Sequence, residues 1–124
     1  WRDLLREGVL IVTGTDAPVE PVNPIANFYA AVTRRSLDGT PATGFEPAQK
    51  LTRQEALYTM TLAGAYAAFE ENEKGSIEVG KLADLTVLSQ DLMTIEADRI
   101  LETVVSWTMV DGEVVYSRNT TKAP

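Results

Sequence analysis

Asp16 is the residue whose type and position best suit chemistry in this sequence. It stands three residues after the apolar run VLIVT (9–13) and just before the proline-containing stretch APVEP. A short β-branched run that is apolar on both faces predicts a strand inside a parallel sheet. A carboxylate is one of the few kinds of side chain in this sequence that could take part in chemistry. The alternative is that Asp16 only closes the turn before Pro18, a common use of aspartate.

The composition restricts what chemistry can accompany this carboxylate, because the chain contains no histidine and no cysteine. Histidine is the usual acid–base group near neutral pH, and histidine and cysteine are common zinc ligands. Serine–histidine catalysis, thiolate chemistry and a self-contained zinc site are therefore not expected. Any chemistry of this chain alone must use carboxylates, lysines, hydroxyls or backbone groups.

Three further residues are candidates for substrate binding: Arg34, Arg35 and Phe45. A guanidinium of the arginine pair could hold a carboxylate or a carbonyl group. The alternative is a solvated helix end, where cations suit the helix dipole. Phe45 lies in a predicted loop and could line a pocket. No lysine is assigned a catalytic role, because the sequence gives no sign that Lys50, Lys74 or Lys81 is buried.

The elements that must position these residues begin with a helix tail at 1–7, followed by the strand at 9–13. Asn23 and Pro24 predict the start of a helix at 24–35. Thr52 and Glu55 form a capping box that opens a helix at 52–70. That helix is apolar on almost every side, which predicts burial by several neighbours. Helix and strand in this order indicate an α/β fold.

Strands dominate the last third of the chain. The patterns predict a strand at 81–89 and a hairpin of 103–110 and 113–117 around Asp111-Gly112, a pair that suits a type I′ turn. Asp84 is expected to hold the turn before its strand. Three strands make a poor independent sheet, because their edges and one apolar face need a partner.

The charge and hydropathy of the chain exclude two classes of partner. The net charge is −7, and no basic run is longer than Arg34-Arg35. We therefore expect no nucleic-acid partner. No apolar run approaches the roughly 20 residues of a membrane span. These features predict an acidic, soluble, cytoplasmic protein without a membrane partner.

Four stretches resemble the C-terminal portion of a metal-dependent amidohydrolase of the amidohydrolase-3 type, the YtcJ-like or N-substituted formamide deformylase group. They are EGVLIVTGTDAPVEPVNPIANFYAAVTRR, LTRQEALYTMTLAGAYAAFE, KGSIEVGKLADLTVLSQD and VVSWTMVDGEVVY. Together they cover nearly all of the chain. The stretch GTDAPVEPVNP followed by AVTRR narrows the resemblance to this group.

The resemblance implies a larger parent protein with a TIM barrel and a small β-sandwich. Residues 1–75 would be the C-terminal part of the barrel, with 9–13 as its last strand, and residues 76–124 would supply returning sandwich strands. It further implies that Asp16 is a metal ligand or neighbour and the general base of C–N bond hydrolysis. The other ligands of the divalent metal, by the same resemblance zinc, would be side chains that this chain lacks.

The resemblance thus implies that the chain is a fragment of a hydrolase acting on amide-like, non-peptide C–N bonds, and that it is inactive alone. Its partners would be a small-molecule substrate and the remainder of the parent chain. The alternative class is a non-catalytic, stand-alone α/β module for assembly or small-molecule binding. A truncated product that forms a homo-oligomer through its exposed sheet edges stays open as a third interpretation.

Overall fold

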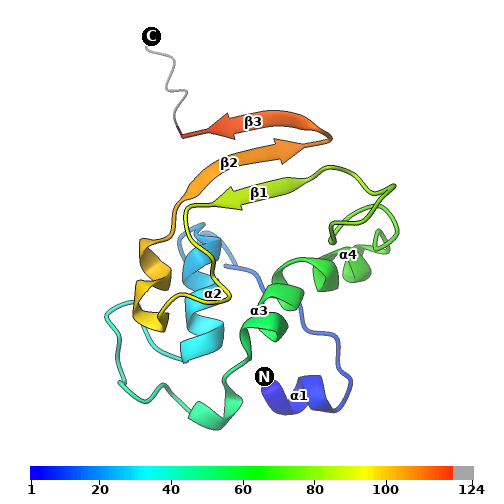
Figure 1. Cartoon of the computed structure of the whole chain (residues 1–124). Helices are drawn as coiled ribbons and strands as arrows, with labels where there is room; N and C mark the ends of the chain where they lie inside the picture. The colour runs from blue at the N-terminus through cyan, green and yellow to red at the C-terminus, as the bar shows by residue number, and fades with distance from the viewer. Residues whose placement is uncertain (119–124) are drawn as a thin grey trace.

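The structure is a computed structural model that describes residues 1–118, and it places a small antiparallel sheet beside a group of short helices (Figure 1). Two 3₁₀ helices, η1 and η2, connect the regular elements. In chain order the elements are α1 (Arg2–Arg6), α2 (Pro24–Thr33), η1 (Pro47–Gln49), α3 (Arg53–Met60), α4 (Leu62–Ala68), β1 (Leu85–Leu88), η2 (Ala97–Glu102), β2 (Val105–Val110) and β3 (Glu113–Ser117). The described residues therefore form a small α/β structure.

Helix α2 is defined at both ends by local chemistry. The Asn23 side chain accepts hydrogen bonds from the amides of Ile25 and Ala26 at 3.1 and 3.4 Å, and Pro24 occupies the first helical turn. The helix ends at Thr33, two residues earlier than expected, because Arg34 adopts a left-handed conformation with φ of 58°. This turn directs the chain into the loop that carries Phe45.

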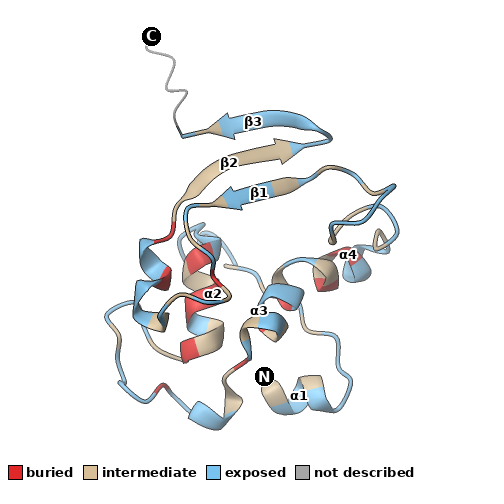
Figure 2. Ribbon diagram, viewed as in Figure 1, coloured by how far each residue is buried: buried red, intermediate tan, exposed pale blue. Residues whose placement is uncertain are grey.

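The hydrophobic core lies around α2 and not under the sheet, as the red segments in Figure 2 show. Phe28 and Ile100, on α2 and η2, are fully buried. By contrast, every residue of the three strands is half-buried or exposed. The buried apolar residues of this core are Ile25, Phe28, Tyr29, Leu51, Ala56, Leu92 and Ile100, so it joins residues from both sides of position 75.

The predicted helix at 52–70 is divided into α3 and α4. Its capping box is confirmed: the Thr52 hydroxyl accepts from the Glu55 amide at 3.2 Å, and the Thr52 amide donates to the Glu55 carboxylate at 2.6 Å. Thr61 leaves helical geometry, with φ of −124° and ψ of −92°, and interrupts the helix. The second part ends at Ala68 because Phe69 is left-handed. The expectation of burial on several sides is wrong for this chain, since large side chains stay exposed at Leu57, Tyr58 and Tyr66.

Residues 9–13, predicted as a strand, form neither strand nor helix in the structure. A strand needs a neighbour that accepts and donates its backbone hydrogen bonds, and no described segment runs beside 9–13 to do so. Thr13 instead donates its amide hydrogen to the carbonyl of Thr59 in α3 at 3.0 Å. The segment leading to Asp16 is thus held by a helix at a single residue.

The sheet has the order β1-β2-β3 with antiparallel pairing throughout. Asp111 and Gly112 both have positive φ, 50° and 80°, which confirms the predicted hairpin turn. The Asp84 carboxylate accepts from the Asp111 amide at 2.8 Å, so it holds the hairpin turn and not the turn before its own strand. No second sheet packs on this one among residues 1–118, and β1 is shorter than the predicted strand 81–89.

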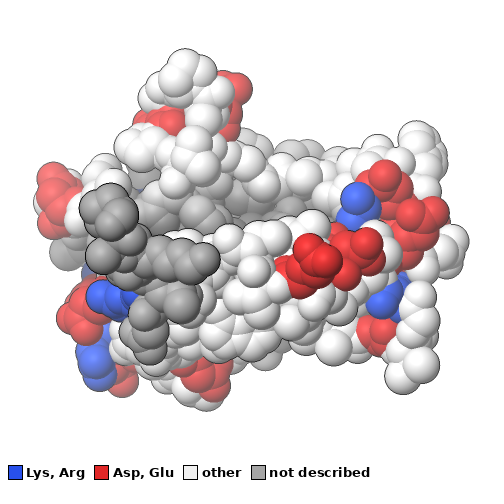
Figure 3. All heavy atoms as spheres, turned by 90° about the horizontal axis from the view of Figure 1, so that it is seen from above, with Lys and Arg blue, Asp and Glu red and all other residues white. Residues whose placement is uncertain are grey.

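The outer strand β3 stays uncovered. Its side chains Val114, Val115 and Tyr116 are all exposed. Figure 3, which views the molecule from above, shows a largely uncharged middle with acidic side chains gathered towards the ends. Separately, no helix within 1–118 is long and apolar enough to cross a membrane.

Candidate functional site

Asp16 lies in the loop between residue 13 and α2, with its side chain exposed. Its backbone is left-handed, with φ of 54°, and its carbonyl accepts the amide of Val19 at 2.8 Å. The turn before Pro18 is therefore closed by the backbone of Asp16, and its carboxylate makes no hydrogen bond or ion pair within residues 1–118. This geometry leaves the carboxylate available to a ligand.

The donor set for a metal is incomplete in this chain. No group of three or more histidine, cysteine, aspartate or glutamate side chains within residues 1–118 could hold a metal ion. A closed zinc site needs about four such ligands. The side chains of the described chain therefore do not fit a metal site, and Asp16 could contribute only one ligand to a site completed by other residues.

Arg34 and Phe45 are brought together, although they are separated by eleven positions. The Arg34 Nε donates to the Phe45 carbonyl at 3.1 Å, and the guanidinium lies 5.6 Å from the centre of the Phe45 ring. The guanidinium also lies 5.9 Å from the Trp1 ring, and its Nη2 is 3.8 Å from the Glu46 carboxylate. Cation–π contacts of this kind are attractive. Arg34 thus contacts both the loop that carries Phe45 and the first residue of the chain, Trp1. Its side chain is only 16% exposed.

Arg35 binds a different element from its neighbour. Its Nη1 donates to the Asp98 carboxylate in η2 at 2.8 Å, which links the end of α2 to η2. Neither arginine contacts Asp16 by a hydrogen bond or ion pair in the described chain. Of the four predicted site residues, the structure joins Arg34 with Phe45 and leaves Asp16 and Arg35 apart from them.

Gly44 makes the close approach of this loop to α2 possible. It has φ of +82°, and a Cβ placed on it would lie 2.2 Å from the Thr33 carbonyl oxygen. The next amide, that of Phe45, donates to the Arg34 carbonyl at 2.7 Å. Only a glycine fits this position without moving the loop.

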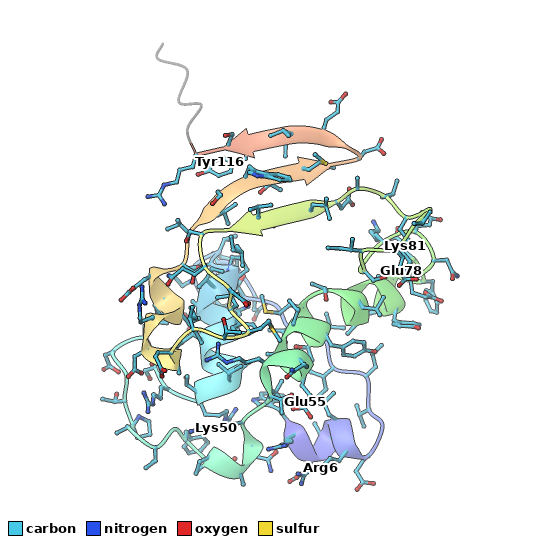
Figure 4. All side chains as sticks on the ribbon, in the orientation of Figure 1. Arg6, Lys50, Glu55, Glu78, Lys81 and Tyr116 are labelled. Atoms are coloured by element: carbon cyan, nitrogen blue, oxygen red, sulfur yellow. The ribbon has the colours of Figure 1, made fainter. Side chains whose placement is uncertain are left out.

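A polar cluster that the sequence did not predict lies at Ser76, Glu78 and Lys81. The Lys81 ammonium donates to the Ser76 hydroxyl at 2.6 Å and lies 3.4 Å from the Glu78 carboxylate, side by side in Figure 4. The Lys81 side chain is only 12% exposed, a burial that the sequence did not indicate. The Ser76 hydroxyl, and then Lys81, lower the pKa of Glu78. Hydrogen bonds and an ion pair thus link Ser76, Glu78 and Lys81 to one another, and they hold the 76–81 turn.

An open groove of about 910 Å³ lies between α3, α4 and β1. Its walls are mainly apolar, with Leu57, Leu62 and Met93 among them, and the charged groups at its lining are Glu70, Lys74 and Asp84. None of the predicted site residues lines it. The groove therefore does not join Asp16, Arg34 and Phe45 into one pocket.

The described residues form an α/β segment, and the exposed Asp16 carboxylate could serve as one acidic group of a site that other residues complete. Comparison with known sequences then identifies the family: the model described as "Amidohydrolase family" matches residues 1–116, and the chain belongs to this family. The predicted resemblance is thus confirmed.

Three similar proteins illustrate the match. The Bacillus subtilis protein named "Putative amidohydrolase YtcJ" is 31% identical over 119 residues, which cover 96% of this chain and 22% of that protein. The N-substituted formamide deformylase of Arthrobacter pascens is 35% identical over 117 residues, which cover 94% of this chain and 21% of that protein. A crystal structure of an amidohydrolase from Thermotoga maritima has a TM-score of 0.69 and 28% identity, covering 94% of this chain and 25% of that one. The chain thus spans about a fifth of the length of the first two relatives.

Proposed function

We propose that this chain is the C-terminal part of a hydrolase that cleaves amide-like, non-peptide C–N bonds. The observation that carries the proposal is the family match across residues 1–116. It is supported by relatives named amidohydrolase and N-substituted formamide deformylase, both aligned over at least 94% of this chain. The active site of a TIM-barrel enzyme lies at the carboxyl ends of its strands, and in the complete protein residues 9–13 would lead Asp16 to that end.

Asp16 is the group of this chain to which we assign chemistry. Its carboxylate is exposed and has no competing hydrogen bond within residues 1–118. As general base it would take a proton from the attacking water while the water oxygen bonds to the carbonyl carbon. As the C–N bond breaks, the same carboxyl group would return that proton to the leaving nitrogen. The products are a carboxylic acid and an amine.

A divalent metal belongs to the proposal for the complete protein but cannot be held by this chain alone. Histidine and cysteine are absent, and the acids of residues 1–118 form no cluster of ligands. Its other ligands would come from the remainder of the parent chain. Arg34 and Phe45 contact each other and hold the loop that carries Phe45. In the complete protein this loop would form one side of the substrate-binding site.

The experiment that tests the proposal is a substrate survey with the complete polypeptide that carries this chain. N-substituted formamides and other small amides are expected to release an amine, whereas matched carboxylic esters and phosphate esters are expected to react more slowly. The control is the 124-residue chain alone, which should release none. A complete polypeptide that hydrolyses only esters or phosphates, or that hydrolyses nothing, would contradict the proposal and favour a non-catalytic module.

A further inference from the structure

Thr59 in α3 is joined to the segment that leads to Asp16 by two hydrogen bonds. The Thr13 hydroxyl donates to the Thr59 hydroxyl oxygen at 2.8 Å, and the Thr13 amide donates to the Thr59 carbonyl at 3.0 Å. The Thr59 hydroxyl in turn donates to the Ala56 carbonyl at 2.9 Å. Thr59 is fully buried, so its two hydroxyl bonds fix a single orientation of its side chain.

This contact is the main attachment of the chain ahead of Asp16. Within residues 1–118, the backbone of 10–18 makes one hydrogen bond to another element, the bond from Thr13 to Thr59. Beside it, Val12 lies close to Gly64 of α4, with 4.0 Å between the Val12 methyl carbon and a Cβ placed on that glycine. Asp16 follows Thr13 by three residues, so the position of its backbone depends on this attachment.

We propose that Thr59, acting through Thr13, is a positioning residue for the Asp16 carboxylate. The inference rests on the proposed function, in which Asp16 is the general base. A catalytic group displaced by about 1 Å can lose roughly 100-fold in rate. A hydroxyl bonded to Thr13 limits such displacement, because it holds the segment against a packed helix and leaves only Gly14 and Thr15 between the attachment and Asp16.

The test compares four proteins made as complete polypeptides: wild type, Thr59→Val, Thr59→Ser and Thr33→Val. Thr59→Val keeps the shape of the side chain and removes the hydroxyl, and Thr59→Ser restores it. Thr33→Val is the matched control, because Thr33 is also buried, at 4% exposure, and its hydroxyl donates to a carbonyl of its own helix, that of Tyr29, at 2.7 Å. Values of kcat and KM for amine release are measured at temperatures where circular dichroism shows each protein fully folded.

Thr59→Val is expected to lower kcat roughly 10- to 100-fold with little change in KM, since only the placement of the reacting group is lost. Thr59→Ser and Thr33→Val are expected to keep kcat near the wild-type value. On an Asp16→Asn background, Thr59→Val should cause no further loss, because residues that act as one unit are not additive. Equal losses in Thr59→Val and Thr33→Val, an unchanged kcat in Thr59→Val, or a full further loss on the Asp16→Asn background would each overturn the inference.

The failure of this inference differs from the failure of the proposed function. If the proposed function fails, Asp16→Asn keeps its kcat or the complete polypeptide does not hydrolyse C–N bonds. If only the positioning inference fails, Asp16→Asn is inactive while Thr59→Val remains active.

A measurement on the 124-residue chain is independent of activity: hydrogen exchange of the Thr13 amide should be at least about tenfold faster in Thr59→Val than in Thr59→Ser. Equal exchange rates in these two variants would also overturn the inference.

Discussion

Gly44→Ala is expected to lower the free energy of unfolding by about 1 kcal/mol more than the same change at Gly39 in the same loop. Both glycines have left-handed backbones, with φ of +82° and +85°. An alanine in this conformation costs about 1–2 kcal/mol. A Cβ at Gly39 meets nothing within 4 Å, so this cost is all that Gly39→Ala should show.

At Gly44 the new Cβ would lie 2.2 Å from the Thr33 carbonyl oxygen, which is backbone and cannot rotate away. The loop must therefore shift, and the shift breaks the hydrogen bond from the Phe45 amide to the Arg34 carbonyl. Losing one such bond costs about 1 kcal/mol. Strain and the lost bond together predict a loss of roughly 2–3 kcal/mol for Gly44→Ala.

The assay is urea unfolding of the 124-residue chain followed by circular dichroism, with the transition midpoints of the two variants compared at an unchanged slope. In a Trp107→Phe background, tryptophan fluorescence gives a local reading, because Trp1 lies against the Arg34 guanidinium that the loop holds. The expected result is a lower midpoint for Gly44→Ala than for Gly39→Ala. Equal midpoints would refute the reasoning, since they would mean that the loop does not approach α2 at Gly44.

Three further predictions concern the capping box and the metal. Thr52→Ala should lower the free energy of unfolding by about 1 kcal/mol in the same urea assay, because it removes the acceptor of the Glu55 amide; a change near zero would contradict the capping role. The Thr52 amide, which donates to the Glu55 carboxylate, lowers the pKa of Glu55 below its ordinary value of 4.5. The stability that Glu55 provides should therefore be present above pH 4.5 and lost as the pH falls through its lowered pKa, so Glu55→Gln should destabilise at pH 7 and cease to do so in acid; the opposite pH trend would count against this assignment. Calorimetric titration of the 124-residue chain with zinc should show no specific binding, and a stoichiometric site would show that its acids alone can form a metal site.

The features that sequence predicts well here are those decided by neighbouring residues. Asn23 with Pro24 begins α2, and Thr52 with Glu55 begins α3, since caps involve residues two or three apart. The Asp111-Gly112 turn is set in the same local way. The break at Thr61 was missed, because no glycine or proline marks it.

The features that sequence did not predict depend on distant partners. An apolar run such as 9–13 forms a strand only beside another strand, and within residues 1–118 it meets α3 instead. Asp16 could be selected as a candidate from its position after that run. The contact of Arg34 with Trp1 could not be predicted, because it joins residues far apart in the chain. The partial burial of Lys81 likewise follows from how the 76–81 turn folds, and nothing in the spacing of its neighbours marks it.

The most direct test of the central claim is the kcat for amine release by the complete polypeptide with Asp16→Asn, compared with Glu20→Gln. Both residues are exposed acids of the same loop, and each change removes one negative charge at nearly constant shape. If Asp16 is the general base of C–N hydrolysis, Asp16→Asn should lower kcat by about 10²- to 10⁴-fold while Glu20→Gln leaves it near the wild-type value. An Asp16→Asn enzyme with wild-type kcat, or equal losses in the two variants, would contradict the claim.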